Sequence, residues 1–292
     1  MITPFKNRQT LQKLRLKMEK EHQLTALDPK EDALEPKNSA CVKKASRGED
    51  QNDGSKSSQE RVKVSEESVA LWASLTTWAT EENCEYLKQN NVQGFGVKKD
   101  KDGRMVVPLR DMDFKFQSLL FIGHVTTNIK HGRRAGLFHV IDPQGRLSEE
   151  RKLTSQETLV ITRSYASAAV VHEMVKAPVI VAFSVLNIIK FAKSFREKYP
   201  DVTLLFALDA MAHQKVNPRL PVMQAAQDVG GHVIIPPFRE TEKSQGLKDW
   251  NDLVGLHGKD RAELLFAAQV RYVLDKERNR KNSREQERGC VL

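Results

Sequence analysis

Three aspartates in the second half of the chain have the chemistry for phosphoryl transfer. Asp209 directly follows the apolar run 203–208, while Asp249 and Asp252 open and close the segment Asp249-Trp-Asn-Asp252. Carboxylates are the ligands that Mg²⁺ needs in such reactions, and several must converge on one ion. Aspartate and asparagine at a helix start also cap backbone N–H groups. We favour this structural role for 249–252, and a weak Mg²⁺ site remains the alternative.

An arginine lies where it would oppose such a metal. Arg163 directly follows the apolar run 159–162, and its guanidinium is permanently charged. Two positive charges ~4 Å apart repel by roughly several kcal/mol at the intermediate dielectric of a cleft. Neighbouring strands of a sheet lie about 5 Å apart, so we expect Arg163 to form an ion pair with Asp209. Arg163 could also bind phosphate directly, or be a surface arginine at a strand end.

A short basic cluster around Gly132 forms a second candidate site. Lys130, Arg133 and Arg134 lie within the segment 130–134, where their cationic groups could follow the phosphates of a nucleic acid. A solvated turn is the alternative. The net charge of +9 and the isoelectric point near 9.4 suggest an anionic partner such as nucleic acid.

The elements that must position these residues are strands and helices in alternation. Continuous apolar runs at 159–162, 178–183, 203–208 and 231–235 are separated by segments of helical length. This pattern predicts an α/β domain with a mainly parallel sheet covered by helices on both faces. Chemistry in such sheets lies at the carboxyl ends of the strands, here after 162 and 208.

The segment before this domain has a different period. Between residues 92 and 138 the apolar positions alternate, and Asp102-Gly103 predicts a hairpin turn between strands at 94–97 and 105–109. Another strand is expected at 116–122. Leu71, Leu75 and Trp78 show helical spacing within 67–87. A small antiparallel α+β subdomain is therefore expected ahead of the parallel sheet.

The chain ends are charged, and we divide the sequence into residues 1–66, 67–147, 148–272 and 273–292. The first region is expected to be disordered because it has too little apolar surface to fold, apart from a possible basic helix at 9–21. The last is a helix-prone tail.

Cys41, Cys84 and Cys290 lack paired spacing, which favours a reducing cytoplasm. No apolar run approaches the ~20 residues that span a bilayer, so no membrane association is expected.

The order and spacing of these segments resemble the TOPRIM domain of primases encoded by conjugative plasmids and related mobile elements. The resemblance covers roughly residues 71–258 and includes Val106–Asp111, Ser118–Ile122, Gly132–His139 and Asp249–Leu253. In that family the first parallel strand ends in Glu-Gly-Tyr-Ala-Thr and the third in Asp-x-Asp. This chain has Arg163-Ser-Tyr-Ala-Ser167 and Asp209-Ala-Met211 instead.

The resemblance implies a primase-type nucleotidyltransferase in which Asp209, Asp249 and Asp252 are the metal-binding and catalytic acids. Since Arg163 and Met211 replace acidic residues of the family, we expect degenerate catalytic motifs, no cofactor or weak Mg²⁺, and no primer synthesis. The predicted function is single-stranded DNA binding through Lys130, Arg133, Arg134 and Arg163. The alternatives are an active primase that uses Asp209, Asp249 and Asp252, or a non-enzymatic partner or inhibitor of conjugative transfer proteins.

Overall fold

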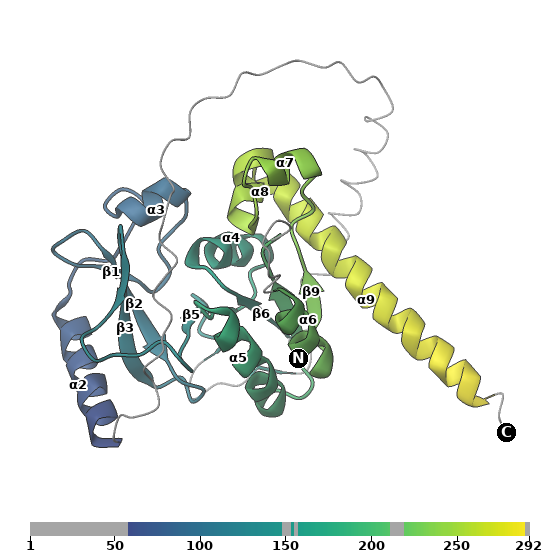
Figure 1. Ribbon diagram of the computed structural model, residues 1–292, viewed down its shortest axis with the longest axis horizontal. Coiled ribbons are helices and arrows are strands. Elements are labelled where there is room, and N and C mark those ends of the chain that lie inside the picture. Colours follow the sequence, from purple (N-terminus) through teal and green to yellow (C-terminus); the bar gives the residue numbers. More distant parts are fainter. Residues whose placement is uncertain (1–57, 148–152, 155–156, 211–218, 290–292) are drawn as a thin grey trace, which may run out of the picture. The chain divides into compact units, whose positions relative to one another are not determined.

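The computed structural model describes residues 58–147, 153–154, 157–210 and 219–289 of this chain. They belong to one compact unit, Asp50–Leu292, which contains two β-sheets (Figure 1). The predicted basic helix at 9–21 lies outside the described residues, as does Met211. Within the described ranges, no helix combines the length and the apolar character needed to cross a bilayer.

The larger sheet is mainly parallel and has the order β5-β7-β6-β8-β9. Its strands are β5 (His139–Ile141), β6 (Thr158–Thr162), β7 (Val179–Val181), β8 (Thr203–Ala207) and β9 (His232–Ile234). Strand β6 lies at the centre, where Ile161 is in register with Ile180 on one side and Phe206 on the other. The predicted four parallel strands are confirmed. Strand β5, which was not predicted, joins the edge antiparallel to β7.

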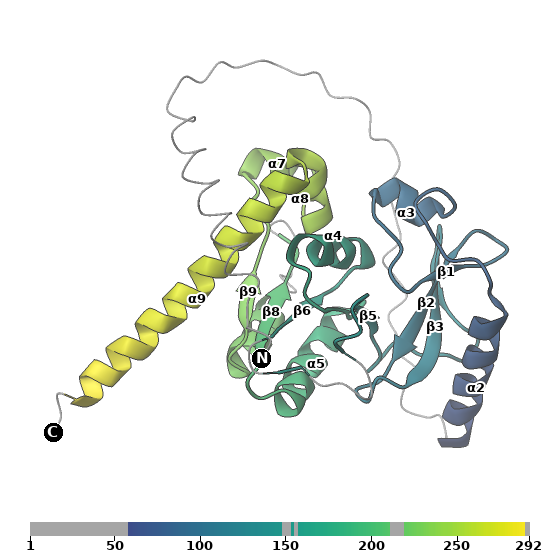
Figure 2. The same ribbon diagram turned by 180° about the vertical axis from the view of Figure 1, so that it is seen from behind.

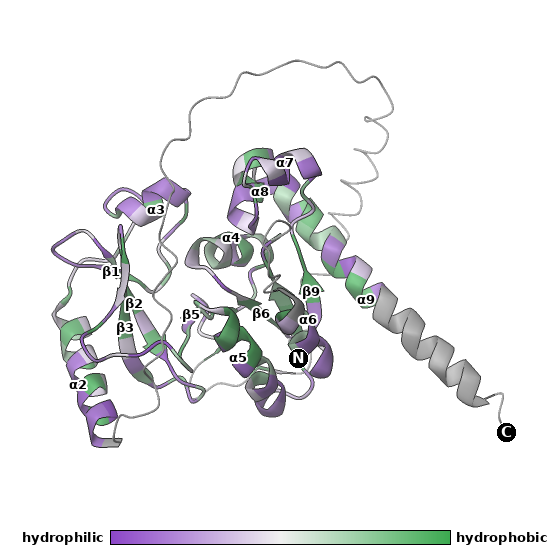
Figure 3. Ribbon diagram, in the orientation of Figure 1, coloured by the Kyte–Doolittle hydropathy of each residue, from purple (hydrophilic) through white to green (hydrophobic). Residues whose placement is uncertain are grey.

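Helices cover both faces of this sheet, as predicted. They are α4 (Tyr165–Val175), α5 (Val185–Lys198), α6 (Arg219–Asp228), α8 (Trp250–His257) and α9 (Lys259–Gly289). Strand side chains alternate between the faces: Val160 packs in the cluster with α4, α8 and α9, whereas Ile161 packs in the cluster with α5 and α6. Both faces of β6 are therefore buried, which explains its continuous apolar sequence (green in Figure 3).

The smaller sheet is antiparallel, as the alternating pattern predicted. Its strands follow in chain order: β1 (Lys98–Lys99), β2 (Met105–Arg110), β3 (Phe116–Ile122) and β4 (Thr126–Asn128). Helix α2 (Ser58–Ser74) packs beside β3, and Figures 1 and 2 show this from opposite sides. Reciprocal backbone hydrogen bonds between Arg110 and Phe138 connect the smaller sheet to the start of β5.

Two local predictions in the antiparallel part were wrong. The segment 94–97 is irregular, and the first strand of the hairpin begins at Lys98, because the backbone of Phe95 bonds to the side chains of Tyr165 and His139 instead of a strand. The helical spacing of 67–87 also does not describe one helix. Helix α2 ends at Ser74, and Trp78 lies on an extended segment paired with Lys98.

Two of the predicted domain limits fall inside regular elements. Helix α2 already begins at Ser58, so residue 66 is within a helix. Helix α9 runs without a break from Lys259 to Gly289, so the proposed limit at 272/273 is within another. The short helices α3 (Glu85–Asn90) and α7 (Glu240–Ser244) complete the described elements.

Candidate functional site

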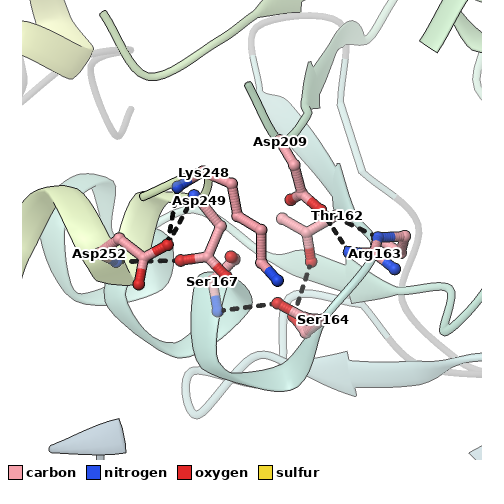
Figure 4. Close-up of polar contacts among 8 residues, drawn as sticks. All are labelled: Thr162, Arg163, Ser164, Ser167, Asp209, Lys248, Asp249 and Asp252. Carbon is pink, nitrogen blue, oxygen red and sulfur yellow. Dashed lines mark hydrogen bonds and ion pairs between the residues drawn. The ribbon is translucent and has the colours of Figure 1, made fainter. Parts of the chain in front are cut away.

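Arg163 and Asp209 meet at the carboxyl ends of two adjacent strands. Thr162 of β6 pairs with Ala207 of β8, so the residues that follow these strands lie side by side. The Arg163 Nε and Nη2 atoms lie 3.0 and 2.5 Å from Asp209 Oδ2 (Figure 4). The predicted ion pair is therefore confirmed.

The turn that carries Arg163 is fixed on both sides. Before it, the amides of Ala182 and Phe183 donate to the carbonyls of Thr162 and Arg163, which extends the β6–β7 contact past the strand ends. After it, Ser164 is the N-cap of α4, and its hydroxyl accepts a hydrogen bond from the Ser167 amide at 3.3 Å. A cap of this kind satisfies a helix N–H that has no partner within the helix. The backbone at residue 163 is thus held between a strand and a helix.

Asp249 and Asp252 form the capping box that starts α8. Asp249 Oδ1 accepts from the amide of Asp252 at 2.9 Å, and Asp252 Oδ2 accepts from the amides of Lys248 and Asp249 at 2.9 and 3.1 Å. These bonds satisfy N–H groups at the helix start. The expected capping role of Asp249 is therefore confirmed, and its partner in the cap is Asp252 rather than Asn251, which we had expected to cap with it.

The start of α8 lies close to the end of β8. The amide of Ala210 donates to the carbonyl of Lys248 at 2.5 Å, which brings Asp249 near Asp209. Burial raises the pKa of the Asp249 carboxyl to about 6, and the negative charges of Asp252 and Asp209 act in the same direction. The Lys248 ammonium partly offsets this rise, and Figure 4 shows its side chain extending toward the side of Ser164. The site thus contains two cationic side chains among three acids.

As they lie, these residues do not fit the metal that the resemblance implies. Mg²⁺ demands a nearly octahedral set of oxygen ligands. Among the residues that the structure describes, no group of three His, Cys, Asp or Glu side chains is placed to hold a metal ion. Asp209 is bonded to a guanidinium, and Asp249 and Asp252 accept from backbone amides.

The basic cluster 130–134 forms a tight loop after β4. The amide of Gly132 donates to the carbonyl of Ile129 at 2.7 Å. A Cβ atom at Gly132 would lie 2.7 Å from Ser118 Oγ, so the loop can close in this way only around glycine. Lys130 is exposed, whereas Arg133 and Arg134 are partly buried.

Asn187, which the sequence analysis missed, fixes the far end of this loop. It is buried in the first turn of α5, where its Oδ1 accepts from the amide of Gly136 at 2.9 Å. Its Nδ2 lies 2.9 and 3.1 Å from the carbonyls of Arg134 and Leu137, and 2.8 Å from that of Ala182. Buried amides must be bonded in this way because an unsatisfied one is costly. The end of the loop is thus attached next to the carboxyl end of β7, and Arg163 lies at the carboxyl end of the neighbouring strand β6.

Lys190, which the sequence analysis also missed, lies beside the loop. A Cβ atom at Gly136 would lie 3.3 Å from Lys190 Nζ and 3.6 Å from Arg133 Nη1, so both cations approach Gly136. An available signal was the spacing of Asn187 and Lys190, which follow the polar Ser184 at the start of a strongly amphipathic helix. That spacing does not reveal which distant segment they contact.

This α/β chain has primase relatives. It is 29% identical over 228 residues to the DNA primase TraC of Escherichia coli, an alignment that covers 75% of this chain and 20% of that protein. A second TraC primase of Escherichia coli is 31% identical over 168 residues, covering 54% and 11% of the two chains. The resemblance to primases of conjugative plasmids is thereby confirmed. The chain spans a fifth or less of the length of these relatives.

Comparison with solved structures gives alignments of low similarity. The RNA polymerase domain of the primase DnaG from Mycobacterium tuberculosis, in complex with double-stranded DNA, aligns with a TM-score of 0.42 and 11% identity. The alignment covers 72% of this chain and 81% of that one. No protein-family model matches the chain.

Proposed function

We propose that this chain is a cytoplasmic, primase-like protein of a mobile element that binds single-stranded nucleic acid and has lost primer synthesis. The observation that carries this proposal is the Arg163–Asp209 ion pair. The side chain of Asp209 is 3% exposed, and its charge is balanced by the guanidinium of Arg163. A cation at this place can hold a phosphate group, but it cannot supply the exchangeable ligand positions of a metal.

Support for the nucleic-acid partner comes from the basic loop. Asn187 bonds to the carbonyl of Arg134 and the amide of Gly136, which attaches the end of the loop beside β7, the strand next to the one that Arg163 follows. The side chain of Arg163 is 37% exposed despite its ion pair, so a ligand can contact part of it. Cationic groups on a fixed loop and a neighbouring strand end suit the contacts that position a phosphate backbone.

An active primase is the second candidate. Asp209 is close enough to Asp249 to raise the pKa of the Asp249 carboxyl, and Asp252 acts in the same direction. The three acids therefore lie near one another. A bound nucleotide that displaced Arg163 from Asp209 could free that carboxylate. Asp209, Asp249 and Asp252 would then be the acids of a Mg²⁺-dependent reaction.

Two measurements separate these functions. Fluorescence anisotropy with a labelled single-stranded oligonucleotide tests binding, and template-directed primer synthesis with Mg²⁺ or Mn²⁺ tests catalysis. We expect salt-sensitive binding and no primer. Primer synthesis by the unaltered chain would establish the active primase. Absence of binding would instead favour a non-enzymatic partner of replication or conjugation proteins.

A further inference from the structure

Two tryptophans and a lysine form an exposed cluster at the edge of the smaller sheet. Trp78 is 57% exposed, and its ring lies 6.1 Å from that of Trp72 in an edge-to-face arrangement. Lys98 Nζ lies 4.6 Å from the centroid of the Trp72 ring and 5.3 Å from that of Trp78. Exposed aromatic surface is thus combined with a fixed positive charge.

The backbone holds Trp78 in place despite its exposure. Trp78 is bridged to Lys98, and the flanking residues are paired to β1 and its approach: Ala79 N donates to Val97 O at 3.1 Å, and Lys99 N donates to Thr77 O at 2.9 Å. The side-chain amide of Asn83 also donates to the Trp78 carbonyl at 2.9 Å. Because the protein backbone at Trp78 is already ordered, a ligand that binds to this indole has a lower entropic cost of binding.

The cluster suits a nucleobase better than a protein surface. The exposed neighbours of Trp78 in the chain are polar, namely Thr76, Thr77 and Thr80. A protein interface would need a contiguous apolar patch. One planar ring needs only one exposed indole, and bases of any sequence stack on aromatic side chains in this way.

Lys98 provides a positive charge beside the two tryptophan rings. Its ammonium donates to the carbonyl of Trp72 at 2.9 Å, which fixes it over both rings. An ammonium carries three donors, so it can also contact a phosphate next to a stacked base. Stacking on aromatic rings beside positive charge is how proteins bind single strands without reading their sequence.

We propose that Trp78, supported by Trp72 and Lys98, is a stacking platform for an unpaired base of single-stranded nucleic acid. The platform rests on the proposed function and assigns it a second contact area, on the smaller sheet, besides the basic loop. The loop contacts phosphates through charge. The platform holds a base through its ring.

Intrinsic fluorescence tests the platform because the chain has three tryptophans, of which Trp250 is 0% exposed. Titration with an oligothymidylate should quench wild-type emission. Trp78→Phe should keep the affinity measured by anisotropy and lose much of the quenching. Trp78→Ala should raise Kd by about 5- to 100-fold, as expected for one lost stack, with an unchanged salt dependence. Lys98→Gln should instead reduce the slope of log K against log salt by about 0.7.

The matched control is Tyr272→Ala, which removes another exposed aromatic side chain from α9. It should leave Kd unchanged, and all variants should retain the wild-type midpoint of thermal unfolding. If folded Trp78→Ala binds as well as wild type, the platform is refuted while the proposed function stands. If the wild type binds no oligothymidylate, both fail. If Trp78 emission responds to protein concentration rather than to DNA, the cluster is a protein contact and the platform is refuted.

Discussion

The side chain of Asp209 is almost completely buried, whereas the side chain of Arg163, which neutralises it, is partly open to solvent. The two side chains have 3% and 37% of their surface exposed. Removing the arginine would leave a buried charge without its partner, while removing the aspartate would leave an arginine that can reach water. The two changes should therefore have unequal effects on stability.

Arg163→Ala should lower the free energy of unfolding by about 1–2 kcal/mol, less than for a fully buried pair because solvent screens the exposed arginine. Asp209→Asn should cost less, since a neutral amide needs no counter-charge. The double variant should recover part of the loss from Arg163→Ala. Urea unfolding of the four proteins measures this coupling. Strictly additive losses would show that the contact contributes nothing to stability.

A second prediction concerns the two acids of the family pattern that this chain lacks, at Arg163 and Met211. Arg163→Glu together with Met211→Asp would remove the positive charge beside Asp209 and add two carboxylates, so binding of Mg²⁺ or Mn²⁺ should strengthen. Calorimetric titration compares this variant with wild type, and Arg163→Gln with Met211→Asn is the neutral control. Equal metal affinity in the acidic and neutral variants would contradict the assignment of Arg163 and Met211 to these positions.

The strands of the larger sheet could be predicted because each is a local apolar run, and the Arg163–Asp209 contact followed from the expectation that their strands are neighbours. Strands β6 and β8 are continuous apolar runs, and neighbouring parallel strands bring their following residues together. The contacts of Asn187 and Trp78 could not be predicted. Asn187 bonds to backbone groups about fifty residues away in sequence, and Trp78 leaves the helical pattern because it pairs with Lys98. The spacing of apolar residues along a short segment does not reveal such distant partners.

The third prediction is a pH-dependent stability that originates at Asp249. Burial raises the pKa of this carboxyl from 3.8 to about 6 in the folded protein. Its contribution is therefore fully present below pH 4 and is lost as the pH rises through 6, because the folded state resists losing the proton. Asp249→Asn keeps a good helix cap and removes the titration.

Relative to Asp249→Asn, the wild type should lose about 2–3 kcal/mol of stability between pH 4 and pH 7. Asp249→Ala should be equally insensitive to pH at this position but about 1 kcal/mol less stable than Asp249→Asn, because it lacks the cap. Urea unfolding at several pH values provides the data. A constant difference between wild type and Asp249→Asn across this range would contradict the shifted pKa.

The fourth prediction concerns the buried amide of Asn187. Asn187→Leu has a similar volume but makes none of the bonds to Arg134, Gly136 and Leu137, so several backbone groups lose their partner. We expect a loss of about 2–3 kcal/mol in stability. We also expect faster amide exchange in 132–137 and weaker binding of single-stranded DNA. The control is Lys193→Ala, which alters the exposed side of the same helix and should leave the loop unchanged. Unchanged exchange in the loop of Asn187→Leu would show that other contacts hold it.

The last prediction separates charge from stacking in nucleic-acid binding. Arg133→Ala with Arg134→Ala removes two cations from the loop, so affinity for an oligothymidylate should fall at low salt. Each phosphate contact releases counterions, and the slope of log K against log salt should become shallower by about 1.4 for two contacts on a single strand. Anisotropy titrations across a range of salt concentrations measure this slope. Arg271→Ala, which removes an exposed cation from α9, should change it little. A double variant with lower affinity but the wild-type slope would mean that the arginines shape the loop without touching phosphate, and the charge contacts would then have to lie elsewhere on the protein.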